Sequence, residues 1–300
     1  MNIGVVEKIA DAVLYEGYLL YPYRSSAVKN QQRFNFGVLY PSEFCKLQSG
    51  CEAWEMTTEC LVSGGDAATV EVKVRFLQMI VRDGRQEGHE RDVSTLAIPL
   101  ERIIRRPLLR EFAFAADAIK GEVELGATQI GKRLFRFTLK IRNRTKVENA
   151  ASLSRDEALL RSLVSIHSIL QTTGGEFISL LDPPEEFKAA AATCQQDGAW
   201  PVLAGENGQQ DMMLSAPIIL YDYPKIAPES AGDLFDGTEI DEILALRILT
   251  MTDEEKAEVR IGDDRARLIL ERTESLPSEH FQKLHGALRG FNTREGQPNE

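Results

Sequence analysis

A strict alternation of apolar and polar residues between Phe135 and Asn143, in FRFTLKIRN, constrains the fold of this chain more than any other feature. Phe135, Phe137, Leu139 and Ile141 take one set of alternate positions, and mostly basic residues take the other. Successive side chains of a β-strand point to opposite faces of a sheet, so this period of two predicts a half-buried strand. We therefore expect a sheet with one buried and one solvated face.

Other short runs rich in Val, Ile, Phe and Tyr also read as strands, separated by turn-forming sequences at 63–69 (SGGDAAT) and 82–92 (RDGRQEGHERD). The expected strands cover residues 13–21, 34–40, 57–62, 69–82, 93–98, 109–115, 121–128 and 133–143. This many strands with few intervening helices predicts antiparallel β structure, as a sandwich or a strongly curved sheet.

A helix is predicted from Ser154, because Ser154 followed by Glu157 forms a capping-box pattern ahead of a run with helical apolar spacing. We expect this helix to continue to the glycine pair at 174–175 and to pack on the sheet. The Ala-rich stretch 185–194 predicts a short helix, and PIILYDY at 217–223 could return to the sheet as a strand.

The last part of the chain carries two further helix-start patterns, Thr238 with Asp241 and Thr252 with Glu255. The expected fold class is therefore α+β. An antiparallel β-rich, sandwich-like N-terminal domain with a packed helix (1–225) precedes an acidic helical region (226–290) and a disordered tail (291–300).

Charge is distributed unevenly along the chain. Residues 1–150 hold 22 Lys and Arg against 19 Asp and Glu, a balance of +3, and the remainder holds 13 against 27, a balance of −14, which together give the net charge of −11. An acidic half of this size argues against nucleic acid as a ligand, because phosphate neutralisation supplies much of that affinity. No stretch approaches the roughly 20 apolar residues that cross a bilayer. We expect a cytoplasmic protein without membrane insertion.

The cysteines and histidines do not form a recognisable site. Cys45, Cys51, Cys60 and Cys194 are too few and too irregularly spaced for a disulfide framework or a zinc site, and we expect reduced thiols. His167 is expected to be a core histidine. Because the common nucleotide, hydrolase, zincin and redox motifs are absent from the sequence, we expect no metal and no cofactor.

Two charged segments have two interpretations each. The acidic segment 229–242 is typical of a helix start, where the helix dipole favours carboxylates, but it could also bind a hard cation. The segment 132–146 carries seven Lys and Arg and no acid. Its basic side chains could pair with the acidic half of the same chain or bind an external anionic partner, and the sequence leaves both open.

Segments 10–41 and 214–256 contain unusual sequence motifs, including LYEGYLLYPYR and PIILYDYPKIAPESAGDLFDG. These segments resemble an uncharacterised bacterial family that is encoded in operons for uptake nickel-iron hydrogenases, among maturation genes. No catalytic residue can be assigned from this resemblance. It implies an accessory or assembly role for a metalloenzyme.

We therefore expect a non-enzymatic accessory protein that binds a hydrogenase subunit or a maturation factor. Its expected partner-binding residues are Tyr21, Tyr23, Arg24, Lys29, Asn30, Arg33, Tyr221, Asp222, Tyr223, Asp233, Asp236 and Glu239. The alternative is a metal-dependent hydrolase or a small-ligand-binding protein that uses the Tyr/Arg loop and the carboxylates of 236–242. A third possibility, a carbohydrate-binding sandwich, predicts exposed aromatic residues on one sheet face, where the strands instead place mostly basic ones.

Overall fold

The computed structural model describes residues 3–15, 36–47, 52–82, 85–114, 118–225 and ten positions between 251 and 274. The described residues up to Lys225 belong to one compact unit, and those from Met251 onward belong to a second. In the second unit, the described positions from Asp253 to Glu274 are helical, and Lys256 and Arg260 both pair with Glu274. The predicted helix start at Thr238 and the predicted tail 291–300 lie outside the described residues.

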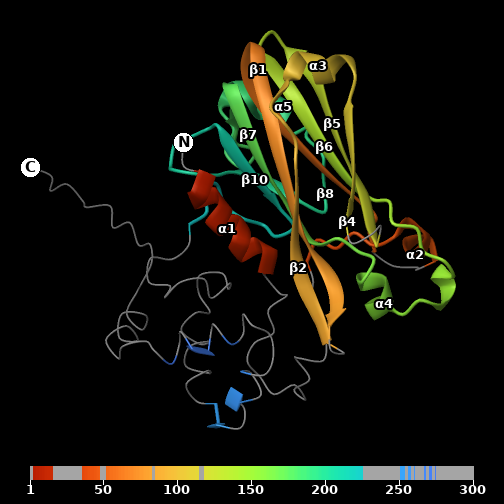
Figure 1. The fold of residues 1–300 in the computed structure, drawn as a ribbon. Helices are drawn as coiled ribbons and strands as arrows, with labels where there is room; N and C mark the ends of the chain where they lie inside the picture. Colours follow the sequence, from red (N-terminus) through yellow and green to blue (C-terminus); the bar gives the residue numbers. More distant parts are fainter. Residues whose placement is uncertain are drawn as a thin grey trace, which may run out of the picture. The chain divides into compact units, whose positions relative to one another are not determined.

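The first unit is built on one antiparallel sheet, as the sequence predicted for its β-rich part (Figure 1). Its main path runs in the order β4-β5-β6-β1-β7-β10-β9, and β2, β3 and β8 pair with β1. The strands are β1 (Glu55–Arg82), β2 (Arg85–Ser94), β3 (Ile98–Pro99), β4 (Leu108–Phe114), β5 (Ile119–Gly131), β6 (Leu134–Asn143), β7 (Val164–Ile178), β8 (Gln196–Asp197), β9 (Trp200–Leu203) and β10 (Met212–Ala216).

The sheet curls because β1 is 28 residues long and changes partners along its length. Its first part pairs with β6, its last part pairs with β2 and β3, and β7 runs beside both parts with a register shift between Gly64 and Thr69. The curl brings β4 back over β1, where the rings of Phe112 and Phe114 each lie with their centroids 5.8 Å from that of Phe76. The architecture is a single curved sheet instead of two stacked ones.

The main core fills the inside of this curl. Phe135, Phe137, Leu139 and Ile141 of β6 are all buried there, which confirms the predicted alternation. On the neighbouring strand β5, Gly121 leaves room for the Phe112 ring, since a Cβ at this position would lie 2.3 Å from the ring. Burial of these apolar side chains supplies the main driving force for folding.

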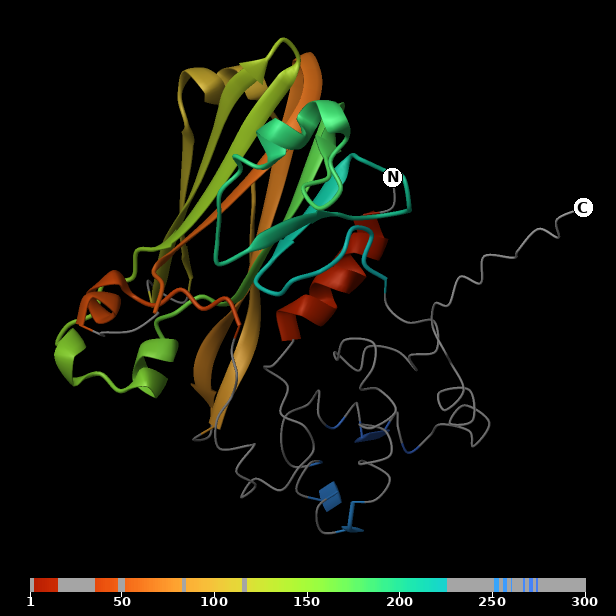
Figure 2. The same cartoon turned by 180° about the vertical axis from the view of Figure 1, so that it is seen from behind.

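Helices pack against parts of the sheet (Figures 1 and 2). Helix α1 (Ile3–Tyr15) packs its apolar side on the outer face of β7, β10 and β9. Helix α3 (Leu100–Arg105) packs on β5 and β1. The shorter pieces are α2 (Ser42–Leu47), the 3-10 helix η2 (Ala150–Ser152), α4 (Arg155–Leu159), the 3-10 helix η3 (Glu185–Phe187) and α5 (Lys188–Ala191), and the last two confirm the predicted helix at 185–194.

The predicted long helix from Ser154 is wrong beyond its first turn and a half. The capping box between Ser154 and Glu157 is present, but α4 ends at Leu159 and the chain continues as strand β7. Strand β7 lies between the main core and α1, so Val164–Leu170 is buried on both faces. A strand that is buried on both faces need not alternate apolar and polar residues, and its sequence can imitate a helical period.

Other predicted boundaries also change. The N-terminal part of the predicted strand 13–21 is the end of α1, and the described residues of 217–223 do not form a strand. The supposed turn at 63–69 is a register shift inside β1, and 82–92 is largely the β1–β2 hairpin. In this hairpin the two strands pair directly, up to Arg82 opposite Arg85. Charged residues are accommodated there because one face of the ribbon is solvated.

Candidate functional site

Of the predicted partner-binding residues, the structure describes Tyr221, Asp222 and Tyr223. The other nine, Tyr21, Tyr23, Arg24, Lys29, Asn30, Arg33, Asp233, Asp236 and Glu239, lie outside the described residues. For this reason the site is built from the segment that follows β10.

Asp222 fixes this segment to two other parts of the unit. Its Oδ2 accepts a hydrogen bond from Ser179 Oγ at 2.5 Å, and its Oδ1 accepts one from the backbone N–H of Leu203 at 2.8 Å. Ser179 Oγ in turn accepts from the backbone N–H groups of Leu181 and Asp182. Hydrogen bonds to a carboxylate are stronger than those between neutral groups, so Asp222 holds the chain after β10 in one conformation.

Tyr223 completes this attachment. Its backbone N–H donates to the carbonyl of Leu203 at 2.7 Å, so both backbone groups of Leu203 at the outer edge of β9 are engaged by residues 222 and 223. The ring of Tyr223 packs against the main core, and burial, followed by the charge of Asp222, raises the pKa of its phenol. A covered strand edge cannot pair with other chains. Asp222 and Tyr223 therefore have structural roles.

Tyr221 has the opposite environment. Its side chain is 86% exposed, and that of Ile219 in the same segment is 79% exposed. Backbone held by Asp222 thus presents an aromatic and an aliphatic side chain to solvent. Large exposed apolar side chains on ordered backbone are typical of protein interaction sites.

The basic segment 132–146 pairs extensively with acids of the same unit. Arg142 Nη1 lies 2.7 Å from carboxylate oxygens of both Glu122 and Glu124, and its Nε donates to Glu55. Arg144 also pairs with Glu122. Burial by itself would raise the pKa of Glu122, but the hydrogen bonds from Arg144 and Arg142 outweigh it and lower the pKa. The acids come from β1 and β5, in the first half of the chain.

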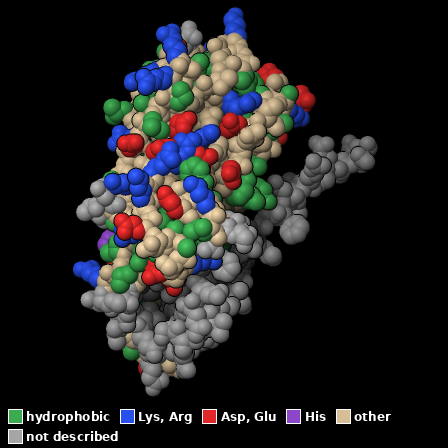
Figure 3. All heavy atoms as spheres, turned by 90° about the vertical axis from the view of Figure 1, so that its right-hand side faces the viewer, with side chains coloured by type: hydrophobic (Ala, Val, Ile, Leu, Met, Phe, Trp, Pro, Cys, Tyr) green, Lys and Arg blue, Asp and Glu red, His purple; other side chains and the backbone are tan. Residues whose placement is uncertain are grey.

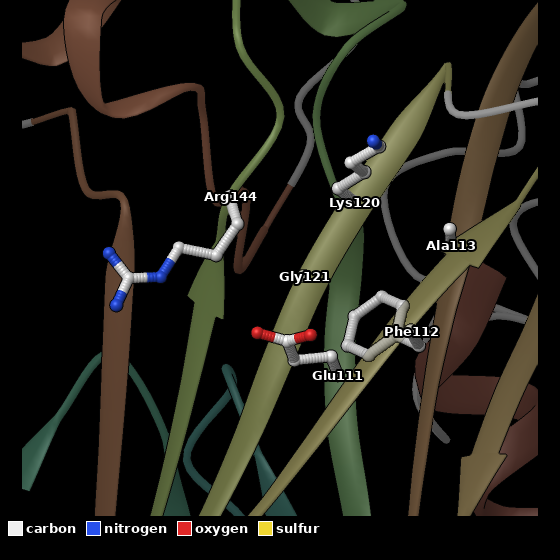
Figure 4. A pocket seen from close by; sticks show the side chains of 6 residues that line it. All are labelled: Glu111, Phe112, Ala113, Lys120, Gly121 and Arg144. Atoms are coloured by element: carbon white, nitrogen blue, oxygen red, sulfur yellow. The ribbon is translucent and has the colours of Figure 1, made fainter.

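A shallow pocket of about 360 Å³ lies beside this network, where β4 and β5 pair (Figure 4). It is lined by Glu111, Phe112, Ala113, Lys120, Gly121 and Arg144. Arg144 is already engaged by Glu122, and the ring of Phe112 covers Gly121. We therefore interpret the pocket as a packing gap beside the cross-strand contact between the Phe112 ring and Gly121.

A buried polar cluster lies under α1. His167 of β7 is fully buried, its Nδ1–H donates to the carbonyl of Ser165 at 3.0 Å, and its Nε2 has no hydrogen-bond partner. Arg75, which pairs with His167 across β1 and β7, extends to Asp11 of α1 at 2.7 Å and lies 3.7 Å from Glu90. The prediction of a buried core histidine is confirmed, although His167 lies on a strand.

The described cysteines are single thiols. Cys60 is fully buried, and burial raises its pKa well above the usual value, while Cys45 and Cys194 are half-buried. Cys51 lies outside the described residues. Within the part of the chain that the structure describes, no group of three His, Cys, Asp or Glu side chains could hold a metal ion.

Sequence reasoning missed the structural role of Asp222, because its partners Ser179 and Leu203 are distant in sequence. No helix among the described residues is long and apolar enough to span a membrane. A scan against protein-family models and a search of the curated proteins each found no match.

Proposed function

We propose that this chain is a non-enzymatic, cytoplasmic accessory protein of nickel-iron hydrogenase assembly that binds a hydrogenase subunit or a maturation factor. The biological context comes from the resemblance of segments 10–41 and 214–256. The binding role is supported by one observation: Tyr221 stands almost fully exposed on backbone that Asp222 ties to Ser179 and Leu203.

This arrangement favours binding for an energetic reason. A side chain on a loop that is already ordered loses little conformational entropy on association, so more of its contact energy appears as affinity. Tyrosine buries a large area with few rotatable bonds and is enriched among the residues that dominate interfaces. Ile219 adds a second exposed apolar side chain to the same segment.

Affinity purification from the native host under hydrogenase-inducing conditions, with mass spectrometry and elemental analysis of the same sample, tests this proposal. We expect stoichiometric recovery of a hydrogenase subunit or maturation factor, and at least a tenfold lower recovery with Tyr221→Ala. Leu109→Ala removes a 52% exposed apolar side chain from β4 and is the matched control. A protein recovered alone with a bound divalent metal would contradict the proposal in favour of the metal-dependent hydrolase.

A further inference from the structure

One end of the curled sheet gathers two elements that are distant in sequence. The β5–β6 turn is attached there by the backbone N–H of Gly64, which donates to the carbonyl of Arg133 at 2.9 Å. Just beyond the register shift of β1, Thr69 pairs with Pro99, and α3 begins at the next residue. The turn and α3 therefore share the end of the sheet that is uppermost in Figures 1 and 2.

This end carries a concentration of positive charge, which we name the basic end. Its members are exposed Lys and Arg side chains from α3, the residue after it and the β5–β6 turn: Arg102, Arg105, Arg106, Lys132 and Arg133. Described acids nearby include Glu101, which pairs with Arg105, and Glu176, which lies opposite Ser63. Glu185, which pairs with Lys188, and Glu186 belong to η3, whose Phe187 packs with Leu134 beside the turn. Figure 3 shows Lys and Arg side chains at this end, and a mixture of basic and acidic ones over the middle of the same face.

Helix capping explains only part of this charge. Arg102 and Arg105 lie in the last turn of α3, where cations stabilise the helix dipole. Arg106 is the C-cap residue of α3, whereas Lys132 and Arg133 belong to the β5–β6 turn and gain nothing from the helix. The five cations of the basic end repel one another, although the chain as a whole has a net charge of −11. Among the described residues, the Glu101–Arg105 pair is the contact that offsets this repulsion.

Exposed apolar side chains accompany the charge. Leu96, on the connection into β3 and α3, is 83% exposed, and Ile130, beside the β5–β6 turn, is 37% exposed. The described exposed aromatic residues, Phe36, Trp200 and Tyr221, all come from other elements. A surface for single-stranded nucleic acid normally offers aromatic rings on which bases stack, and the basic end offers aliphatic side chains instead.

We propose that the basic end docks an acidic protein segment that also carries apolar side chains. This inference rests on the proposed function in so far as that function supplies a protein partner. Electrostatic complementarity would steer the acidic segment to this end, and Leu96 and Ile130 would contact its apolar residues. The negative charge of the remainder of the chain would repel the same acidic segment.

The binding of fluorescently labelled poly-L-glutamate by the full chain at 50 mM salt tests the charge requirement. We expect saturable binding that weakens at least tenfold at 300 mM salt, because screening shortens the reach of exposed charges. Arg102→Glu with Arg106→Glu should weaken binding at least tenfold, and Lys132→Glu at least threefold. Lys146→Glu makes the same change at an exposed lysine beyond the other end of β6 and should leave binding unchanged.

In the binding assay, three outcomes would overturn the inference: no binding of poly-L-glutamate, an equal loss with Lys146→Glu, or tighter binding of oligothymidylate than of poly-L-glutamate. The proposed function is judged separately by partner recovery from the native host. Recovery that survives the Arg102→Glu, Arg106→Glu variant would reject the basic end while leaving the accessory role intact. Because all the substituted side chains are exposed, the far-UV circular dichroism should remain that of the unchanged protein.

Discussion

The buried imidazole of His167 makes the stability of the first unit depend on pH. The pKa of His167 is lowered to about 3, mainly by burial and also by the positive charge of Arg75, while the hydrogen bond with the Ser165 carbonyl and the charge of Glu90 act in the opposite direction. Asp11 of α1 and Asp92 of β2 also lie around Arg75. An unfolded chain leaves the imidazole in water, where its pKa is 6.5.

The sign follows from proton binding in the two states. Between pH 6.5 and about 3 the unfolded state binds a proton at His167 that the folded state does not. The contribution of this group is therefore fully present above pH 6.5 and is lost as the pH falls toward 3. Each pH unit inside this window costs about 1.4 kcal/mol, so lowering the pH from 7.5 to 5 should remove about 2 kcal/mol of unfolding free energy.

Urea unfolding of the wild-type chain and of His167→Gln at pH 7.5 and 5 measures this contribution. The variant should be less stable at pH 7.5 but should lose about 2 kcal/mol less than the wild type on acidification. His89→Gln makes the same change on β2, where the side chain is 40% exposed, and is the matched control. Comparing the acid losses of the two variants separates the contribution of His167 from the acid effects that both variants share. Equal acid losses in His167→Gln and wild type would refute the reasoning.

Three further substitutions test the contacts described above by urea unfolding at pH 7.5. Asp222→Ala leaves a hydroxyl and a backbone N–H without their acceptor and should cost about 1–3 kcal/mol; no change would show that Asp222 does not hold its segment. Arg142→Ala removes the main cation beside buried Glu122 and should cost about 3 kcal/mol, with the loss shrinking in acid. Gly121→Ala places a Cβ against an aromatic ring and should cost about 1–3 kcal/mol, whereas Gly126→Ala on the same strand meets nothing within 4 Å and should be nearly neutral.

The parts of the fold that could be predicted from the sequence are those determined by nearby residues. Strand β6 has one face in the core and one in solvent, so its alternation is visible in nine residues. The capping box at Ser154 is equally local and is present. Both features can be recognised from a short stretch of sequence, because neighbouring residues alone explain them.

The failures occur where distant segments decide the outcome. Val164–Leu170 is a strand because β1 and β10 pair with it and α1 covers its outer face, and none of these partners is adjacent in sequence. The sequence predicts two strands, 57–62 and 69–82, where the structure has the single strand β1 (Glu55–Arg82). The Gly and Ala residues at the register shift of β1 resemble a turn. Tertiary pairing overrides such local signals.

The contacts of residues 222 and 223 change the interpretation of the distinctive motif in segment 214–256. A residue whose identity is explained by its own packing provides no evidence of a partner, and this applies to Asp222 and to Tyr223. Tyr221 directly precedes these two residues and is 86% exposed, and the described contacts give no structural reason for an aromatic residue there. An exposed tyrosine next to a residue that is tied to the rest of the unit loses little conformational entropy when it binds a partner. Within this segment, the proposed binding role is therefore assigned to Tyr221.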